Sequence, residues 1–210
     1  MESWRSSRHF QFSTRIPLHN ESGLKSEFPT LQLKMLKRQT SVGIAGDGRC
    51  LFRSVIHGAW LRAGRQSPSD SLQRELADEL RAKVADEFLL RRAETEWFVE
   101  GDFDAYVRQM RQPHSWGGEP ELLMSSHVLK MPITVYMRDK TSGSLKNLSE
   151  YGQEYGKENP IRVLYHGYGH YDLLRGARKD DEDDYVGSHN SAQIPKLFNF
   201  ISSFMDEIIY

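Results

Sequence analysis

Hydrophobic residues recur at helical spacing in four segments of the middle part of this chain, and all four precede the first clear strand pattern. The segments cover residues 50–63, 72–88, 103–110 and 119–129. Apolar side chains three and four residues apart lie on one face of a helix, so each segment is expected to bury such a face. The pattern predicts four helices, of which the first is the most apolar and therefore heavily buried.

Residues suited to helix starts stand before these segments. Ser69 or Ser71 can cap the second helix and Asp102 the third, because their side-chain oxygens accept hydrogen bonds from unpaired N–H groups. Pro120 lies at the start of the fourth helix, where its missing N–H costs little. The first helix is expected to begin at Cys50, directly after a glycine-rich bend.

Strand patterns appear late in the chain. Residues 133–138 alternate between apolar and other side chains with a period of two, which is typical of a strand. Two further strand-like runs, residues 161–165 and 170–174, flank a turn that contains Gly167 and Gly169. The sequence therefore predicts helices followed by a small sheet that packs on the Cys50 helix.

The two ends of the chain differ from this middle part, which we take as one domain over residues 28–176. Residues 1–27 are rich in Ser, Arg, His and Asn and are expected to form a flexible arm, although their composition is also compatible with an organellar transit peptide. Residues 177–193 contain an acidic run, expected as a solvated linker. Residues 194–210 have apolar positions at helical spacing, and they either dock on the domain or serve as a partner helix.

Composition narrows the class of protein. The 28 basic residues nearly balance the 29 acidic ones, so no excess charge favours nucleic acid or anionic lipid as a partner. No apolar run is long enough for a membrane span. A single cysteine excludes an internal disulfide and fits a reducing compartment. We therefore expect an intracellular protein of the cytoplasm or nucleus.

Cys50 is the candidate nucleophile, since the bend before it contains Gly46, Asp47 and Gly48. A thiol reacts as the thiolate, and the unpaired N–H groups and dipole at a helix start favour that anion. A nucleophilic cysteine also needs an imidazole to take its proton and a third group to orient that imidazole.

His170 is the histidine for which the spacing supplies an orienting group. Residues i and i+2 of a strand point to the same face, so His170 and Asp172 are expected to lie side by side. His57 is too far along the helix from Cys50 for proton transfer. His114 and His127 stay open as alternatives on spacing alone.

His166 and His170 are four residues apart, a spacing that also occurs in metal sites. The two glycines between them oppose a helix, and neither a second cysteine nor an acidic ligand set accompanies them at usual zinc spacing. The sequence therefore predicts no metal site.

Three segments together resemble the ovarian-tumour (OTU) family of deubiquitinating cysteine proteases, and plant members most of all. They are DGRCLFR at residues 47–53, WGGEPEL at 116–122 and GHYD at 169–172. Their order, and the gap of about 120 residues between thiol and imidazole, also match. The resemblance covers residues 40–175 and implies a papain-like fold of the α/β (α+β) class, with a small central sheet packed between helices.

The resemblance also assigns roles to residues. It implies Cys50 as nucleophile, His170 as general base and then acid, and Asp172 as the residue that orients the imidazole. Asp47 matches an aspartate that some members use near the active site, although we expect it to brace the loop or cap the helix. Many members carry asparagine where this chain has Arg49.

The remaining predicted positions concern substrate binding. Backbone N–H groups of the turn at residues 48–50, which contains Gly48 and Arg49, are expected to hold the oxyanion, a role in which the Arg49 side chain is replaceable. The resemblance places Trp116 and Gly117 near the cleft, where glycine leaves room for an extended peptide. The alternative is a loop tryptophan packed under a helix start.

The function that the resemblance implies is hydrolysis of isopeptide bonds at the C-terminal glycine of ubiquitin by a thiol, without a cofactor. The expected partners are ubiquitin or polyubiquitin chains and ubiquitinated proteins, and the protein is expected to be a monomer. Three alternatives stay open: an inactive ubiquitin-binding module, a protease for a ubiquitin-like modifier, and a scaffold that acts through the acidic tail and last helix.

Overall fold

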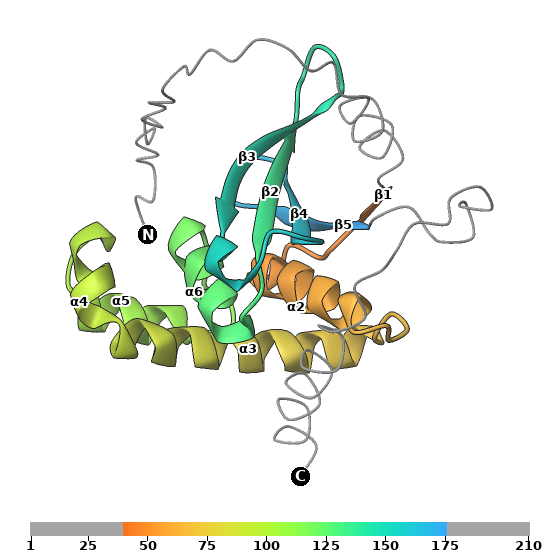
Figure 1. The fold of residues 1–210 in the computed structure, drawn as a ribbon. Helices are drawn as coiled ribbons and strands as arrows, with labels where there is room; N and C mark the ends of the chain where they lie inside the picture. The colour runs from red at the N-terminus through yellow and green to blue at the C-terminus, as the bar shows by residue number, and fades with distance from the viewer. Residues whose placement is uncertain (1–39, 176–210) are drawn as a thin grey trace, which may run out of the picture.

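A mixed sheet of five strands and a group of helices make up residues 40–175, the part of the chain that the computed structural model describes (Figure 1). The predictions for residues 1–27, 177–193 and 194–210, and the domain limits at 28 and 176, lie outside the described residues. The helices are α2 (Cys50–Arg62), α3 (Asp70–Leu90), α4 (Arg92–Thr95), α5 (Phe103–Met110) and α6 (Glu119–Leu129), with short 3-10 helices η1 (Glu96–Phe98) and η2 (Gln153–Tyr155).

The strands occur in the sheet in the order β1-β5-β4-β2-β3. They are β1 (Thr40–Val42), β2 (Ile133–Arg138), β3 (Leu145–Tyr151), β4 (Ile161–Tyr165) and β5 (Tyr171–Arg175). β2 and β4 are parallel, and the other neighbours are antiparallel. Tyr165 pairs with Tyr171, so β4 and β5 form the predicted hairpin. The α+β fold predicted from the sequence is confirmed.

The four predicted helices form, and their caps explain where they start. The Ser69 hydroxyl, rather than that of Ser71, accepts a hydrogen bond from the Leu72 N–H at 3.3 Å. Asp102 accepts from the Ala105 N–H at 2.7 Å. No side chain caps α2, although the helix begins at Cys50 as predicted.

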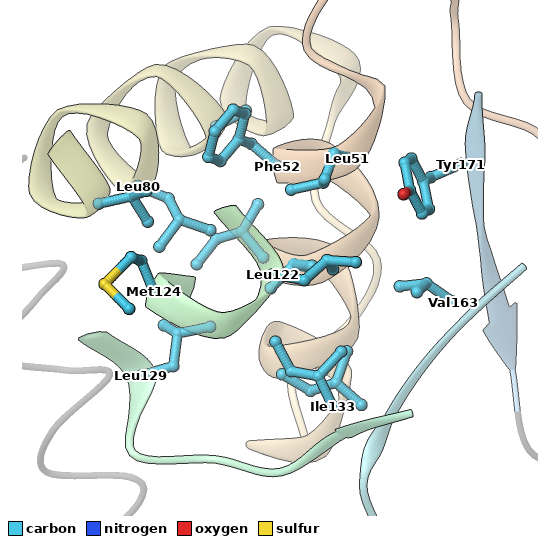
Figure 2. Packing of buried hydrophobic residues seen from close by; sticks show 14 of the residues in the cluster. Leu51, Phe52, Leu80, Leu122, Met124, Leu129, Ile133, Val163 and Tyr171 are labelled. Carbon is cyan, nitrogen blue, oxygen red and sulfur yellow. The ribbon is translucent and has the colours of Figure 1, made fainter. Parts of the chain in front are cut away.

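The core lies on both sides of α2, in which every residue from Cys50 to Trp60 is buried. This helix lies between α3 and the strands β4 and β5 (Figure 1). In Figure 2, Phe52 points toward α3, whereas Val163 and Tyr171 reach toward α2 from the sheet. Burial of these apolar side chains is the main favourable term that holds the layers together, at about 25 cal/mol per Å² removed from water.

The sequence pattern missed several short or edge elements. β3 carries mostly polar residues and lies at the edge of the sheet, so its hydrophobic alternation is weak. β1 is only three residues long, and α4 only four. His170, expected inside a strand, lies one residue before β5. Over residues 40–175, none of the helices has the length and apolar character that crossing a membrane requires.

Leu80 and Leu90 provide a matched test of this core, because both lie on α3 and only the first is buried. Leu80→Ala should lower the free energy of unfolding by about 2–5 kcal/mol, since the lost contacts leave a cavity. Leu90→Ala should change it by less than about 0.5 kcal/mol, because that side chain is exposed. Urea unfolding followed by circular dichroism measures both, and equal losses would contradict this packing.

Candidate active site

The Cys50 side chain lies at the first turn of α2, against the loop that leads into β5. Its sulfur is 3.7 Å from the carbonyl oxygen of Gly169, a residue 119 positions later in the chain. One turn further along the helix, the Ser54 hydroxyl donates to the Tyr171 carbonyl at 3.1 Å. These two contacts fix the start of α2 to the residues on either side of His170.

The His170 ring is oriented by Asp172, as the spacing of the two residues predicted. Its Nε2 lies 3.2 Å from Oδ1 of Asp172, and that oxygen also accepts the Ile44 N–H at 2.9 Å. The other ring nitrogen, Nδ1, faces the loop before Cys50, since a Cβ at position 46 would lie 3.7 Å from it. An imidazole that donates from one nitrogen presents the other as a base.

Burial governs the acidity of the thiol. Removal from water raises the pKa of the Cys50 thiol, and the negative charge of Asp47 acts in the same direction. Backbone N–H groups of Tyr171, Leu51 and Cys50 itself oppose this effect by favouring the thiolate. The helix start therefore helps the anion, as expected from the sequence, but burial outweighs it. The thiol needs a base beside it to ionise at neutral pH.

Asp47 braces the loop before the helix. Its Oδ1 accepts the Arg49 N–H at 3.0 Å, and its Oδ2 lies 3.7 Å from the Arg53 guanidinium. The described contacts of the Asp47 side chain include none with His170. This geometry corrects one expectation, because the Arg49 N–H already has an acceptor and is not available as an oxyanion donor.

The Arg49 side chain turns toward α3 instead of toward Cys50 and His170. Its Nε and Nη2 donate to the two carboxylate oxygens of Asp78 at 2.8 and 3.0 Å. This paired hydrogen bond raises the pKa of the Arg49 guanidinium and attaches the Cys50 loop to α3.

Trp116 and Gly117 lie beside Cys50 and its neighbours. A Cβ on Gly169 would lie 2.9 Å from Cε3 of Trp116, so the indole covers this glycine and leaves no room for a side chain there. Trp116 is 51% exposed, which is at odds with a tryptophan packed under a helix start. A Cβ on Gly117 would lie 3.2 Å from Leu51 of α2. Both residues therefore border the site.

Arg81 is a residue of this region that the sequence analysis did not identify. It lies on α3, almost completely buried, with its guanidinium 4.4 Å from the centre of the Phe52 ring. It donates to four backbone carbonyls, in the Cys50 loop, at the end of α5 and in the loop after α5: Gly48 at 2.7 Å, Ser115 at 2.9 Å, and Met110 and Pro113 at 3.1 Å each. The sequence feature that could have indicated this residue is an arginine directly after Leu80, within a segment whose apolar positions have helical spacing.

The other histidines have separate surroundings. His57 is buried on α2, and burial lowers its pKa to about 4, so it stays neutral. His127 lies 2.8 Å from the Tyr155 hydroxyl, and His114 lies 3.3 Å from the Asp47 carbonyl oxygen.

His166, considered from sequence only as a metal ligand, has its Nε2 2.7 Å from Oδ2 of Asp172. Over residues 40–175, no three His, Cys, Asp or Glu side chains group in a way that could hold a metal ion.

Replacing Arg81 tests the connection between the two loops. Arg81→Met should lower the free energy of unfolding by about 3 kcal/mol or more, because several buried carbonyls lose their donor. Arg111→Met is the control, since Arg111 is partly exposed and pairs with Asp86 on the surface; it should cost less than about 1 kcal/mol. Denaturant unfolding of both variants measures the difference, and similar small losses would contradict the role given to Arg81.

Comparison with known proteins agrees with this geometry. Residues 45–172 match the family model described as OTU-like cysteine protease. An Arabidopsis thaliana protein named OVARIAN TUMOR DOMAIN-containing deubiquitinating enzyme 4 is 71% identical over 133 residues, which cover 63% of this chain and 42% of that protein. Deubiquitinating enzyme 3 of the same plant is 33% identical over 155 residues, covering 63% of this chain and 66% of that protein. The chain thus spans less than two thirds of either relative.

Solved structures show the same fold. The OTUD1 OTU domain superposes with a TM-score of 0.53 at 25% identity, over 70% of this chain and 93% of that one. The Hazara virus OTU domain, solved bound to ubiquitin, gives a TM-score of 0.53 at 22% identity, over 69% of this chain and 86% of that one. With its thiol, imidazole and carboxylate in one site and the family match over most of the described residues, this chain belongs to the OTU-like cysteine protease family.

Proposed function

We propose that this protein is a deubiquitinase that hydrolyses isopeptide bonds at the C-terminal glycine of ubiquitin. The observation that carries the proposal is the contact of the Cys50 sulfur with the Gly169 carbonyl, next to a histidine that Asp172 orients. Two plant relatives named as deubiquitinating enzymes support ubiquitin as the substrate. Within this proposal, ubiquitinated proteins and polyubiquitin chains are the partners, and a monomer acts in the cytoplasm or nucleus.

The reaction starts with transfer of the Cys50 proton to Nδ1 of His170. The thiolate then attacks the carbonyl carbon of the terminal glycine, and a tetrahedral oxyanion forms. His170 gives its proton to the lysine amine as the C–N bond breaks, which leaves a thioester on Cys50. Water, deprotonated by the same imidazole, hydrolyses the thioester and returns the proton to sulfur.

Backbone N–H groups of Gly48 and Cys50 are the donors that we assign to the oxyanion. Asp47 accepts the Arg49 N–H, and Arg81 donates to the Gly48 carbonyl. These two bonds fix the orientation of the peptide group between Gly48 and Arg49. Gly48 has φ +85°, and a Cβ there would lie 2.6 Å from backbone atoms of His114. Only glycine fits this bend, so the loop geometry depends on it.

Trp116 is the side chain that we assign to the ubiquitin tail. Its half-exposed indole lies on Gly169, directly beside the carbonyl that contacts the thiol. An extended chain that ends in two glycines can pass close to such a ring, because it carries no side chain that would collide with the ring.

A ubiquitin probe with an electrophilic C-terminus tests the activity. The wild-type chain should form a covalent adduct through Cys50, and Cys50→Ser should form none, since a serine hydroxyl is far less ionised than a thiol at neutral pH. A panel of ubiquitin dimers should be cleaved by the wild type only.

The probe and the panel of ubiquitin dimers together distinguish the rival functions. Folded wild-type protein that binds ubiquitin but neither reacts with the probe nor cleaves any dimer would be a binding module instead of an enzyme. Reaction confined to a probe built on a ubiquitin-like modifier would make it a protease for that modifier.

Substitutions of Asp172 and Asp47 test which of the two is the third catalytic residue. Asp172→Ala should lower kcat/KM by about 100-fold or more, because His170 loses the group that orients it. Asp172→Asn keeps an acceptor oxygen and should lose less. Asp47→Ala should cost about tenfold or less, since Asp47 contacts the loop and not the imidazole. Hydrolysis of a fluorogenic ubiquitin substrate measures all three, and a larger loss for Asp47→Ala, with each variant folded, would reverse the assignment.

A further inference from the structure

The carboxylate that orients His170 has a second imidazole on its other oxygen. Nε2 of His166 lies 2.7 Å from Oδ2 of Asp172, while Nε2 of His170 lies 3.2 Å from Oδ1. The two rings are 5.5 Å apart between centres. Asp172 is buried, whereas the His166 side chain is 42% exposed and can exchange protons with solvent.

The hairpin turn creates this arrangement. Gly167, Tyr168 and Gly169 all have positive φ, at 86°, 55° and 81°, and this reversal puts residues 166 and 170 on the same side of the sheet. The His166 N–H donates to the His170 carbonyl at 3.0 Å, which closes the turn. The conformation is costly for Tyr168, which has a side chain, so the turn is maintained by the bonds on either side of it.

We propose that His166 is a positioning residue for the catalytic carboxylate, and that its protonation weakens the pairing of Cys50 with His170. This inference rests on the proposed thiol chemistry of Cys50. Neutral His166 donates one hydrogen bond to Oδ2, so it holds Asp172 in the rotamer that serves His170. A protonated His166 does the same but adds a positive charge beside the carboxylate.

That charge acts on the catalytic pair. A cation next to Asp172 offsets the negative charge that supports the His170 imidazolium, and it also repels that imidazolium across the short distance between the rings. The ionisable groups in contact with His166 are Asp172 from β5 and His170 from the turn, and the Cys50 thiol lies at the Gly169 carbonyl next to His170. The thiolate–imidazolium pair should therefore be suppressed as the pH falls and His166 gains a proton.

The single cysteine of this chain allows a direct measurement. The rate at which iodoacetamide alkylates the full-length protein reports the reactivity of the Cys50 thiolate alone, from pH 5 to 9, and needs no ubiquitin. His166→Gln retains an N–H donor for Asp172 but cannot become charged. His127→Gln is the matched control, because His127 contacts Tyr155 and Glu154 and not the catalytic groups.

His166→Gln should react about threefold or more faster than wild type at pH 5.5, and the two rates should converge as the pH rises to 8. His127→Gln should follow the wild-type curve throughout. If His166 had a purely structural role, His166→Gln would change the alkylation rate by the same factor at every pH. The shape of the pH curve on its acid side would then stay that of the wild type. Superimposed curves for wild type and His166→Gln, or an equal shift in His127→Gln, would overturn the proposal.

Hydrolysis of a fluorogenic ubiquitin substrate tests the hydrogen bond to Asp172. At pH 8, His166→Ala should lower kcat/KM by about tenfold, whereas His166→Gln should stay within about twofold of wild type. Wild-type turnover in His166→Ala would overturn the positioning role. A shifted alkylation curve in a protein that cleaves no ubiquitin conjugate would support the inference about His166 and contradict the proposed deubiquitinase function.

Discussion

The contact between the first turn of α2 and the start of β5 is the constraint on which the site depends. Cys50 and Gly169 are far apart in the chain, and the approach of the sulfur to the Gly169 carbonyl requires helix and hairpin to dock closely. The Ser54–Tyr171 hydrogen bond fixes the same two elements one turn further along. Because α2 is buried along most of its length, shifting it relative to the sheet would disturb the whole core. The position of the thiol is therefore set by core packing.

Electrostatics at the site centre on the buried Asp172 carboxylate. Burial of a charge is tolerated when hydrogen-bond donors surround it, and Asp172 faces Ile44, His166 and His170. The thiol is in the opposite situation, because burial raises the pKa of Cys50 by more than the nearby backbone N–H groups lower it. In the proposed reaction, the His170 imidazolium stabilises the charged form of Cys50. Asp172 controls that imidazolium by orientation and by charge.

A second group of contacts joins the loops beside the site to α3. Asp78 and Arg81 lie three residues apart on α3, so they project from neighbouring positions on that helix. Asp78 binds the Arg49 side chain, and Arg81 binds the carbonyls of the Cys50 loop and of the loop that carries Trp116. A guanidinium has five N–H donors in a rigid plane, which lets one buried side chain hold several carbonyls at once. The geometry of the loops around Cys50 therefore depends on a helix that does not itself reach the thiol.

Local sequence determined much of this protein. Helical periodicity located the four main helices, Ser69 and Asp102 marked two of their starts, and the two glycines of the 166–170 turn indicated the hairpin, because these signals act between residues close in the chain. The pairing of His170 with Asp172 followed from the same short-range geometry. Tertiary structure alone decided that the thiol lies against the Gly169 carbonyl beside this pair, and that Arg81 and His166 belong to the site. Those contacts join distant segments or depend on how a turn reverses, and hydrophobic periodicity carries no information about where a buried polar side chain finds its partners.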